Sequence, residues 1–142
     1  MPRLNWLRFL IAALVASIIL FMTDGFLHEQ VFMSDWRAVY AGLGIAEPHH
    51  EAGGIIYFVI FELGRGFISI FFYVLMRSFF GAGPKTAVLA AVVGWIAFSL
   101  TGPAQFIPLG FYSNALWIKV AAAQFVTSIV ATIAGAALYK EA

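Results

Sequence analysis

The sequence contains no cysteine and few charged residues. None of its 142 residues is Cys, and Asp, Glu, Lys and Arg together make up only 11%. Without cysteine the chain has no disulfide, no thiolate metal ligand and no thiol nucleophile. Its formal net charge of +1 provides no basic surface that would neutralise phosphates. These absences exclude a thiol-based site and argue against a nucleic-acid partner.

The sequence also lacks the common motifs of enzymes. It contains no G-x-S-x-G nucleophile elbow, no H-E-x-x-H zinc motif and no phosphate-binding P-loop. Its Asp and Glu residues are too scattered along the chain to form a recognisable acid/base pair. We therefore expect a protein that is not an enzyme and predict no cofactor.

Long apolar runs take the place of charge. Hydrophobic residues make up 63% of the chain, whereas about half is usual for a soluble domain. A transmembrane helix needs about 20 mainly apolar residues. Segments of that length cover residues 4–27, 54–80, 85–109 and 114–139. The sequence predicts a single-domain, all-α membrane protein, a bundle of four transmembrane helices in a lipid bilayer, with the third helix kinked at Pro103.

A short amphipathic helix is predicted in the loop between the first two spans. Trp36, Val39, Tyr40 and Leu43 follow the i, i+3, i+4, i+7 spacing of one helical face. Ser34 is a candidate N-cap for a helix over residues 35–43. Such a helix would lie on the membrane surface or over the end of the bundle. An ordinary structured loop is the alternative.

The basic residues predict the orientation. Four spans place both termini on one side of the membrane, and five basic residues fall on that side: Arg3, Arg8, Arg77, Lys85 and Lys140. Only Arg37 lies clearly in the opposite loops. Basic residues concentrate in cytoplasmic loops. We therefore expect both termini in the cytoplasm, the first loop outside it, and a location in a bacterial inner (plasma) membrane.

Two opposite charges inside the second span are the most informative residues. Glu62 and Arg65 are three residues apart, so they share a helical face and can form an ion pair. At 1.5 Å per residue they lie about 13 and about 18 Å below Gly53, near the middle of a hydrocarbon core about 30 Å thick. Charges at that depth face protein, a cavity or each other, and they mark functional sites.

Polar residues on the other spans are expected at similar depth. We predict one buried polar cluster with these members: Asp24, Glu62, Arg65, Gln105, Lys119 and Gln124. Such a cluster would relay protons or ions, or anchor a polar ligand group. The alternative is an ion pair that fixes helix register or docks a partner subunit.

The histidines form a second group, at the end of the bundle away from the termini. Its members are His28, His49, His50 and Glu51. Imidazole and carboxylate ligands suit Zn, Cu or Fe, and a histidine can also ligate the metal of haem or a pigment. Solvent-exposed loop histidines are the simpler interpretation, because the spacing matches no established metal site.

Small residues recur at a spacing of four. Ala90 and Gly94 lie in the third span, and Ala131 and Gly135 in the fourth. Small residues let helices approach closely in lipid, where no hydrophobic force drives their association. The pattern predicts tight packing, either within the bundle or against another protein.

Three functions are compatible with these observations. The first is a small accessory or structural subunit, or a self-associating component, of a membrane complex. Four short helices cannot easily enclose an alternating-access pathway, so the second is an oligomeric transporter or channel for protons, ions or a small solute that uses Glu62. The third is a haem-, pigment- or metal-binding membrane protein. The expected partners are therefore other membrane subunits or further copies of the chain.

Overall fold

The described part of the chain is helical apart from its turns. A computed structural model describes residues 4–47 and 52–140. The elements are α1 (Trp6–Phe26), η1 (Leu27–Val31), α2 (Met33–Leu43), α3 (Ala52–Phe80), α4 (Pro84–Trp95), η2 (Ile96–Thr101), α5 (Gly102–Ala104) and α6 (Asn114–Leu138). Here η marks a π-helical turn, which is wider than an α-helical one. No strand is found in the ranges that the structure describes.

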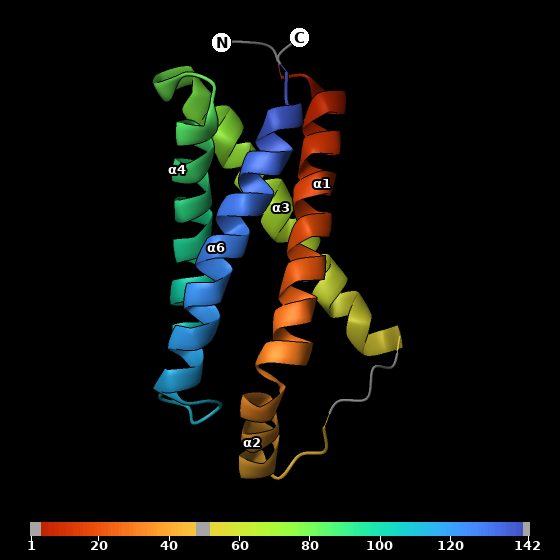
Figure 1. The fold of residues 1–142 in the computed structure, drawn as a ribbon, viewed down its shortest axis with the longest axis vertical. Coiled ribbons are helices and arrows are strands. Elements are labelled where there is room, and N and C mark those ends of the chain that lie inside the picture. Colours follow the sequence, from red (N-terminus) through yellow and green to blue (C-terminus); the bar gives the residue numbers. More distant parts are fainter. Residues whose placement is uncertain (1–3, 48–51, 141–142) are drawn as a thin grey trace.

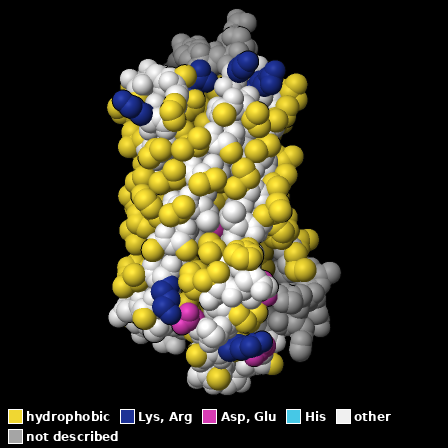
Figure 2. All heavy atoms as spheres, viewed as in Figure 1, with side chains coloured by type: hydrophobic (Ala, Val, Ile, Leu, Met, Phe, Trp, Pro, Cys, Tyr) yellow, Lys and Arg dark blue, Asp and Glu magenta, His cyan; other side chains and the backbone are white. Residues whose placement is uncertain are grey.

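Four helical segments are long and apolar enough to cross a membrane. They are Trp6–Val31, Gly54–Phe80, Pro84–Ala104 and Asn114–Leu138. The prediction of an all-helical protein with four membrane-spanning helices is confirmed at this level. Figure 2 shows a broad hydrophobic band between two ends that carry Lys and Arg. A surface of this kind matches a lipid bilayer.

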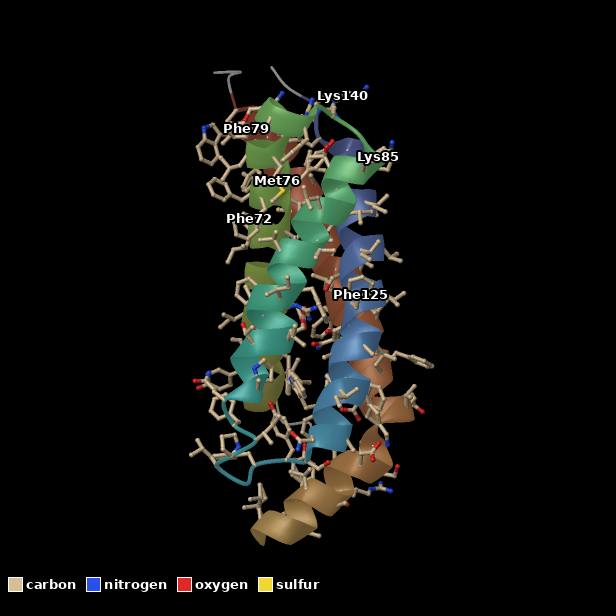
Figure 3. The ribbon with its side chains drawn as sticks, turned by 90° about the vertical axis from the view of Figure 1, so that its left-hand side faces the viewer. Phe72, Met76, Phe79, Lys85, Phe125 and Lys140 are labelled. Atoms are coloured by element: carbon tan, nitrogen blue, oxygen red, sulfur yellow. The ribbon has the colours of Figure 1, made fainter. Side chains whose placement is uncertain are left out.

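The spans form a bundle in which α1 and α4 each pack against both α3 and α6. Figure 1 shows the start of α1, the end of α6 and the α3–α4 turn at one end, called the terminal end below. Lys85 and Lys140 both lie there (Figure 3). Helix α2 lies at the opposite end, called the α2 end (Figure 1). Gly81 and Gly83, with φ of 79° and 137°, form the tight α3–α4 turn, and Pro84 opens α4.

Small residues allow the helices to pack closely. A Cβ atom on Gly66 would lie 2.6 Å from the backbone nitrogen of Ser17, and one on Gly135 would lie 2.6 Å from the backbone oxygen of Ala12. Ala90, Gly94, Ala131 and Gly135 are all buried. The predicted small-residue packing therefore lies inside the bundle. Gly66 was not part of that prediction, although it lies at a close contact between α1 and α3.

The third span ends earlier than expected. It passes from α4 into η2, continues through α5 and ends at Ala104, whereas the sequence predicted a helix to residue 109. Pro103 has no N–H, and its ring crowds the preceding turn, so the helix widens before it. The Thr101 hydroxyl donates to the Ile96 carbonyl at 2.8 Å and satisfies part of the widened turn. Residues 105–110 form turns.

A helix also forms in the first loop, at Met33–Leu43. The expected cap at Ser34 is wrong, because the helix begins at Met33, two residues earlier than predicted, and its N-cap Phe32 makes no side-chain hydrogen bond. Gly44, with φ of 67°, ends it. Figure 3 shows α2 running obliquely across this end of the bundle. That α2 lies in the membrane interface stays a prediction.

Helix α3 leaves the bundle at its α2 end. Figure 1 shows its first turns diverging from the other spans. Of residues 54–61, all but Val59 are exposed, including Tyr57 at 74% and Phe58 at 65%. Glu62 is the first buried residue of the described side chains of this helix. The buried charges therefore lie where α3 joins the bundle.

Candidate functional site

The centre of the site is one guanidinium between two carboxylates. Asp24 of α1, and Glu62 and Arg65 of α3, are 3%, 5% and 3% exposed. The Nη1 atom of Arg65 donates to Asp24 Oδ2 and, at 2.9 Å, to each carboxylate oxygen of Glu62. The Arg65 Cζ atom also lies 5.6 Å from the centre of the Phe61 ring. The three charges thus form a single buried group.

Helix α6 supplies the neutral partners. The Gln124 amide donates to Asp24 Oδ2 at 2.7 Å, and the Thr127 hydroxyl donates to Asp24 Oδ1 at 2.9 Å. The Ser128 hydroxyl accepts from Arg65 Nη2 at 3.2 Å. Residues 124, 127 and 128 lie on one helical face because their spacing is i, i+3, i+4. Through these bonds the site joins α1, α3 and α6.

This arrangement can hold charge at membrane depth. Burying an unpaired ion costs several kcal/mol, and partners recover the cost only where hydrogen bonds replace the lost water. Arg65 and Asp24 each have such partners on more than one helix. The site contains two acidic groups and one basic group, so its charges balance only when one acidic group is protonated.

The structure brings together four of the six residues predicted for the polar cluster. Asp24, Glu62, Arg65 and Gln124 meet there. Lys119 does not, because it is 52% exposed and its Nζ pairs with Asp35 of α2 at 3.0 Å. Lys119 precedes Gln124 by five residues, which turns it about 140° around the helix. The prediction considered depth alone and not the direction in which the side chain points.

Gln105 is also outside the cluster. The helix ends at Ala104, which leaves Gln105 exposed in the following turn. Its amide nitrogen donates to the Gly102 carbonyl at 2.9 Å. A residue beyond the end of a span does not reach a site in its interior, so the misplaced helix end explains this error.

Sequence reasoning did not place Thr127 or Ser128 in the site. The available signal was their spacing from Gln124, which places all three on one face. Hydroxyl residues on apolar helices commonly bond to their own backbone, and Thr23 does so here, donating to the Ile19 carbonyl at 2.7 Å. The sequence therefore does not reveal whether a threonine hydroxyl donates to its own backbone, as in Thr23, or to a side chain of another helix, as in Thr127.

Of the predicted metal ligands, His28 is described. Its Nδ1 atom accepts from Trp36 Nε1 at 2.8 Å, and its ring contacts Phe32 and Trp36. This nitrogen is therefore not free to bind a metal in this arrangement. His49, His50 and Glu51 lie outside the described residues. Within residues 4–47 and 52–140, no group of three His, Cys, Asp or Glu side chains is placed to hold a metal ion.

A shallow groove lies close to the charged site. It has a volume of about 350 Å³ and is lined by Phe61, Ala97, Phe98, Gly102, Pro103, Gln105, Phe106 and Tyr112. Phe61 lies between this groove and Arg65. A second groove of about 370 Å³ lies between α4, η2 and α6, where the rings of Trp95 and Phe125 are 5.0 Å apart. Figure 3 labels Phe125 on α6.

Hydrogen bonds and ring contacts connect the elements of the α2 end. The Tyr112 hydroxyl donates to the Pro103 carbonyl at 2.7 Å, and the Tyr112 and Trp36 rings are 6.1 Å apart. Burial raises the pKa of the Tyr112 hydroxyl above its usual value. The Trp117 indole donates to the Leu100 carbonyl at 3.0 Å. These contacts hold α2 and the turns of residues 105–113 against the end of the bundle.

Comparison of the chain with protein families, curated proteins and solved structures finds no match.

Proposed function

We propose that this membrane protein is a small accessory subunit of a membrane complex, and that it docks through the part of α3 that leaves the bundle. The observation that carries the proposal is the exposure of residues 54–61, which belong to a span yet have few neighbours in the chain. A four-helix protein that needed no partner would gain contacts by packing this segment against its own spans. Divergence of the segment leaves it available to a helix of another protein.

The residue types exposed on this part of α3 favour contact with a helix of another protein over contact with lipid alone. Tyr57, Ile60 and Gly64 follow the i, i+3, i+7 spacing and share one face. Nothing lies within 4 Å of the place where a Cβ on Gly64 would be. A small residue beside large ones allows a second helix to approach closely, and such residues are common where membrane helices associate. We call the face of Tyr57, Ile60 and Gly64 the docking face.

Site-specific photo-crosslinking in native membranes tests this proposal. A photoreactive phenylalanine at Tyr57 or Ile60 is expected to form a protein adduct of one defined mass. The matched control places the same group at Val126 or Val130, which are exposed on α6. An adduct with a larger membrane protein that purifies with the chain supports an accessory subunit. An adduct with a second copy indicates self-association, and adducts with lipid alone would overturn the proposal.

The buried charges favour a second candidate, an oligomeric transporter or channel for protons or ions. Acidic groups inside membrane spans commonly form proton relays. In this candidate Glu62 carries the transported charge. Purified protein in liposomes with a pH gradient would then collapse the gradient faster than empty liposomes, and Glu62→Gln would remove the difference. Equal rates for the wild type and for empty liposomes would exclude this candidate.

We also propose that the terminal end faces the cytoplasm of a bacterial cell. The support is the distribution of charge among the described residues. Arg8, Arg77, Lys85 and Lys140 are assigned to the terminal end, whereas Arg37 and Lys119 belong to the α2 end. Basic residues close to a span favour retention on the cytoplasmic side, and four of these six belong to the terminal end.

A further inference from the structure

The charged site contains one more acidic than basic group. Fully ionised, Asp24, Glu62 and Arg65 sum to a charge of −1. The hydrogen-bond partners that α6 contributes, Gln124, Thr127 and Ser128, are neutral side chains. A net charge inside a hydrocarbon core is costly because the medium screens it poorly. One bound proton would remove this cost.

Within residues 4–47 and 52–140, no charged side chain on the neighbouring elements compensates the excess. Among the described residues, Lys85 is the one charged residue of Pro84–Ala104, and it lies at the terminal end. Lys119 of α6 pairs with Asp35. Arg8 of α1 and Arg77 of α3 belong to the terminal end, where Arg77 stacks on Tyr73 and Tyr139.

Among the described residues, His28 is the histidine of the α2 end. His28 of η1 lies within electrostatic reach of Asp24 and Arg65, and it also interacts with Glu29. Its Nδ1 accepts a hydrogen bond from Trp36, which requires that this nitrogen carry no proton. The ring in this arrangement is therefore neutral and does not balance the site.

The two carboxylates differ in the donors that they receive. Asp24 accepts from Arg65, Gln124 and Thr127, and these bonds use both of its oxygens. Both oxygens of Glu62 accept from the single atom Arg65 Nη1. That nitrogen carries two hydrogens and also donates to Asp24. The two oxygens of Glu62 therefore share the one remaining N–H. Hydrogen bonds to a carboxylate favour its ionised form, and Asp24 has more of them.

We propose that the site binds one proton, which resides on Glu62 while Asp24 remains the ionised partner of Arg65. The step is a simple protonation: a Glu62 oxygen forms an O–H bond with a proton from hydronium, whose O–H bond breaks to leave a water molecule, and no oxidation state changes. The inference does not depend on docking or on transport. The proton can be bound at Glu62 whether or not the protein moves protons across the membrane.

Infrared spectroscopy of the protein in lipid nanodiscs at neutral pH tests the inference. A protonated carboxyl group has a C=O stretching band that ionised carboxylates lack, and the band shifts when H₂O is exchanged for D₂O. The wild type is expected to show this band with the intensity of one group per chain. Protein labelled with ¹³C at the glutamate carboxyl groups should show the band shifted, which assigns it to Glu without any substitution.

Variants then locate the proton. Glu62→Gln should lose the band. Asp24→Asn should lose it as well, because Glu62 would then ionise to balance Arg65. Asp35→Asn is the matched control and should keep it, because Asp35 belongs to the exposed pair with Lys119. Three results would overturn the inference. They are the absence of the C=O band in the wild type, a band that does not shift with the ¹³C label, and a band that is still present in Glu62→Gln.

Discussion

Asp24 and Arg65 form an ion pair between residues 41 positions apart in the chain. The pair joins the last turns of α1 to the middle of α3 and is almost fully buried. It gives Arg65 a carboxylate partner that does not belong to its own helix. Loss of Glu62 therefore does not leave the guanidinium unpaired, and the two acidic groups are expected to respond differently to substitution.

The first prediction concerns Arg65 itself. Arg65→Gln would leave the Asp24 carboxylate buried without a cation, next to the carboxyl group of Glu62. Removing one partner of a buried ion pair costs about 3–5 kcal/mol, so we expect a loss of this size in the free energy of unfolding. Thermal unfolding in a mild detergent measures it. Arg8→Gln is the control, because Arg8 is exposed at the terminal end, and its melting temperature should stay close to that of the wild type.

The second prediction compares the two acidic residues. Asp24→Asn replaces the oxygen that accepts from Arg65 and Gln124 and changes the acceptor of Thr127. An unsatisfied buried donor costs about 1–3 kcal/mol. The carbonyl of Glu62→Gln still accepts from Arg65 Nη1, so we expect that variant to lose less than about 1 kcal/mol. The same unfolding assay compares them, and a larger loss for Glu62→Gln would contradict the hydrogen-bond count.

The third prediction concerns the crossing of α1 and α3. A Cβ on Gly66 would lie 2.1 Å from Ser17 Oγ and 2.8 Å from Ser17 Cα, so Gly66→Ala would push the two helices apart. Overpacking of this kind costs about 1–3 kcal/mol. Gly64→Ala is a matched control on the same helix, because nothing lies within 4 Å of its Cβ position. It should keep or raise the melting temperature, since alanine favours helix. Equal effects of the two variants would show that the crossing is looser than described.

Much of this architecture could be predicted from the sequence. The four spans follow from the length of the apolar runs, because a run of about 20 apolar residues crosses a bilayer as a helix, which satisfies its own backbone hydrogen bonds. The Glu62–Arg65 contact follows from a spacing of three on one helix. Asp24 and Gln124 followed from an estimate of depth. Each of these inferences uses distance along the helix axis, which the sequence gives directly.

The remaining contacts depend on how the helices are rotated and where they cross. Lys119 lies at a suitable depth but points toward Asp35. Gly66 lacks a small residue four positions away, so the pattern of paired small residues did not reveal it, although its contact with Ser17 fixes the crossing. Thr127 joins the site because α6 presents that face to Asp24. Rotation about each axis follows from the packing of all four spans together.

The last prediction tests the orientation and uses the absence of cysteine. A single introduced cysteine is the only thiol in the chain, so its labelling reports one position. Arg37→Cys lies at the α2 end, and Lys85→Cys lies at the terminal end (Figure 3). In spheroplasts of a bacterial host, a thiol reagent that cannot cross membranes is expected to label Arg37→Cys and to leave Lys85→Cys unlabelled. Permeabilising the membrane should then expose Lys85→Cys, which confirms that this thiol is reactive. Labelling of Lys85→Cys before permeabilisation, with Arg37→Cys protected, would place the terminal end outside the cytoplasm and reverse the assignment made from the basic residues.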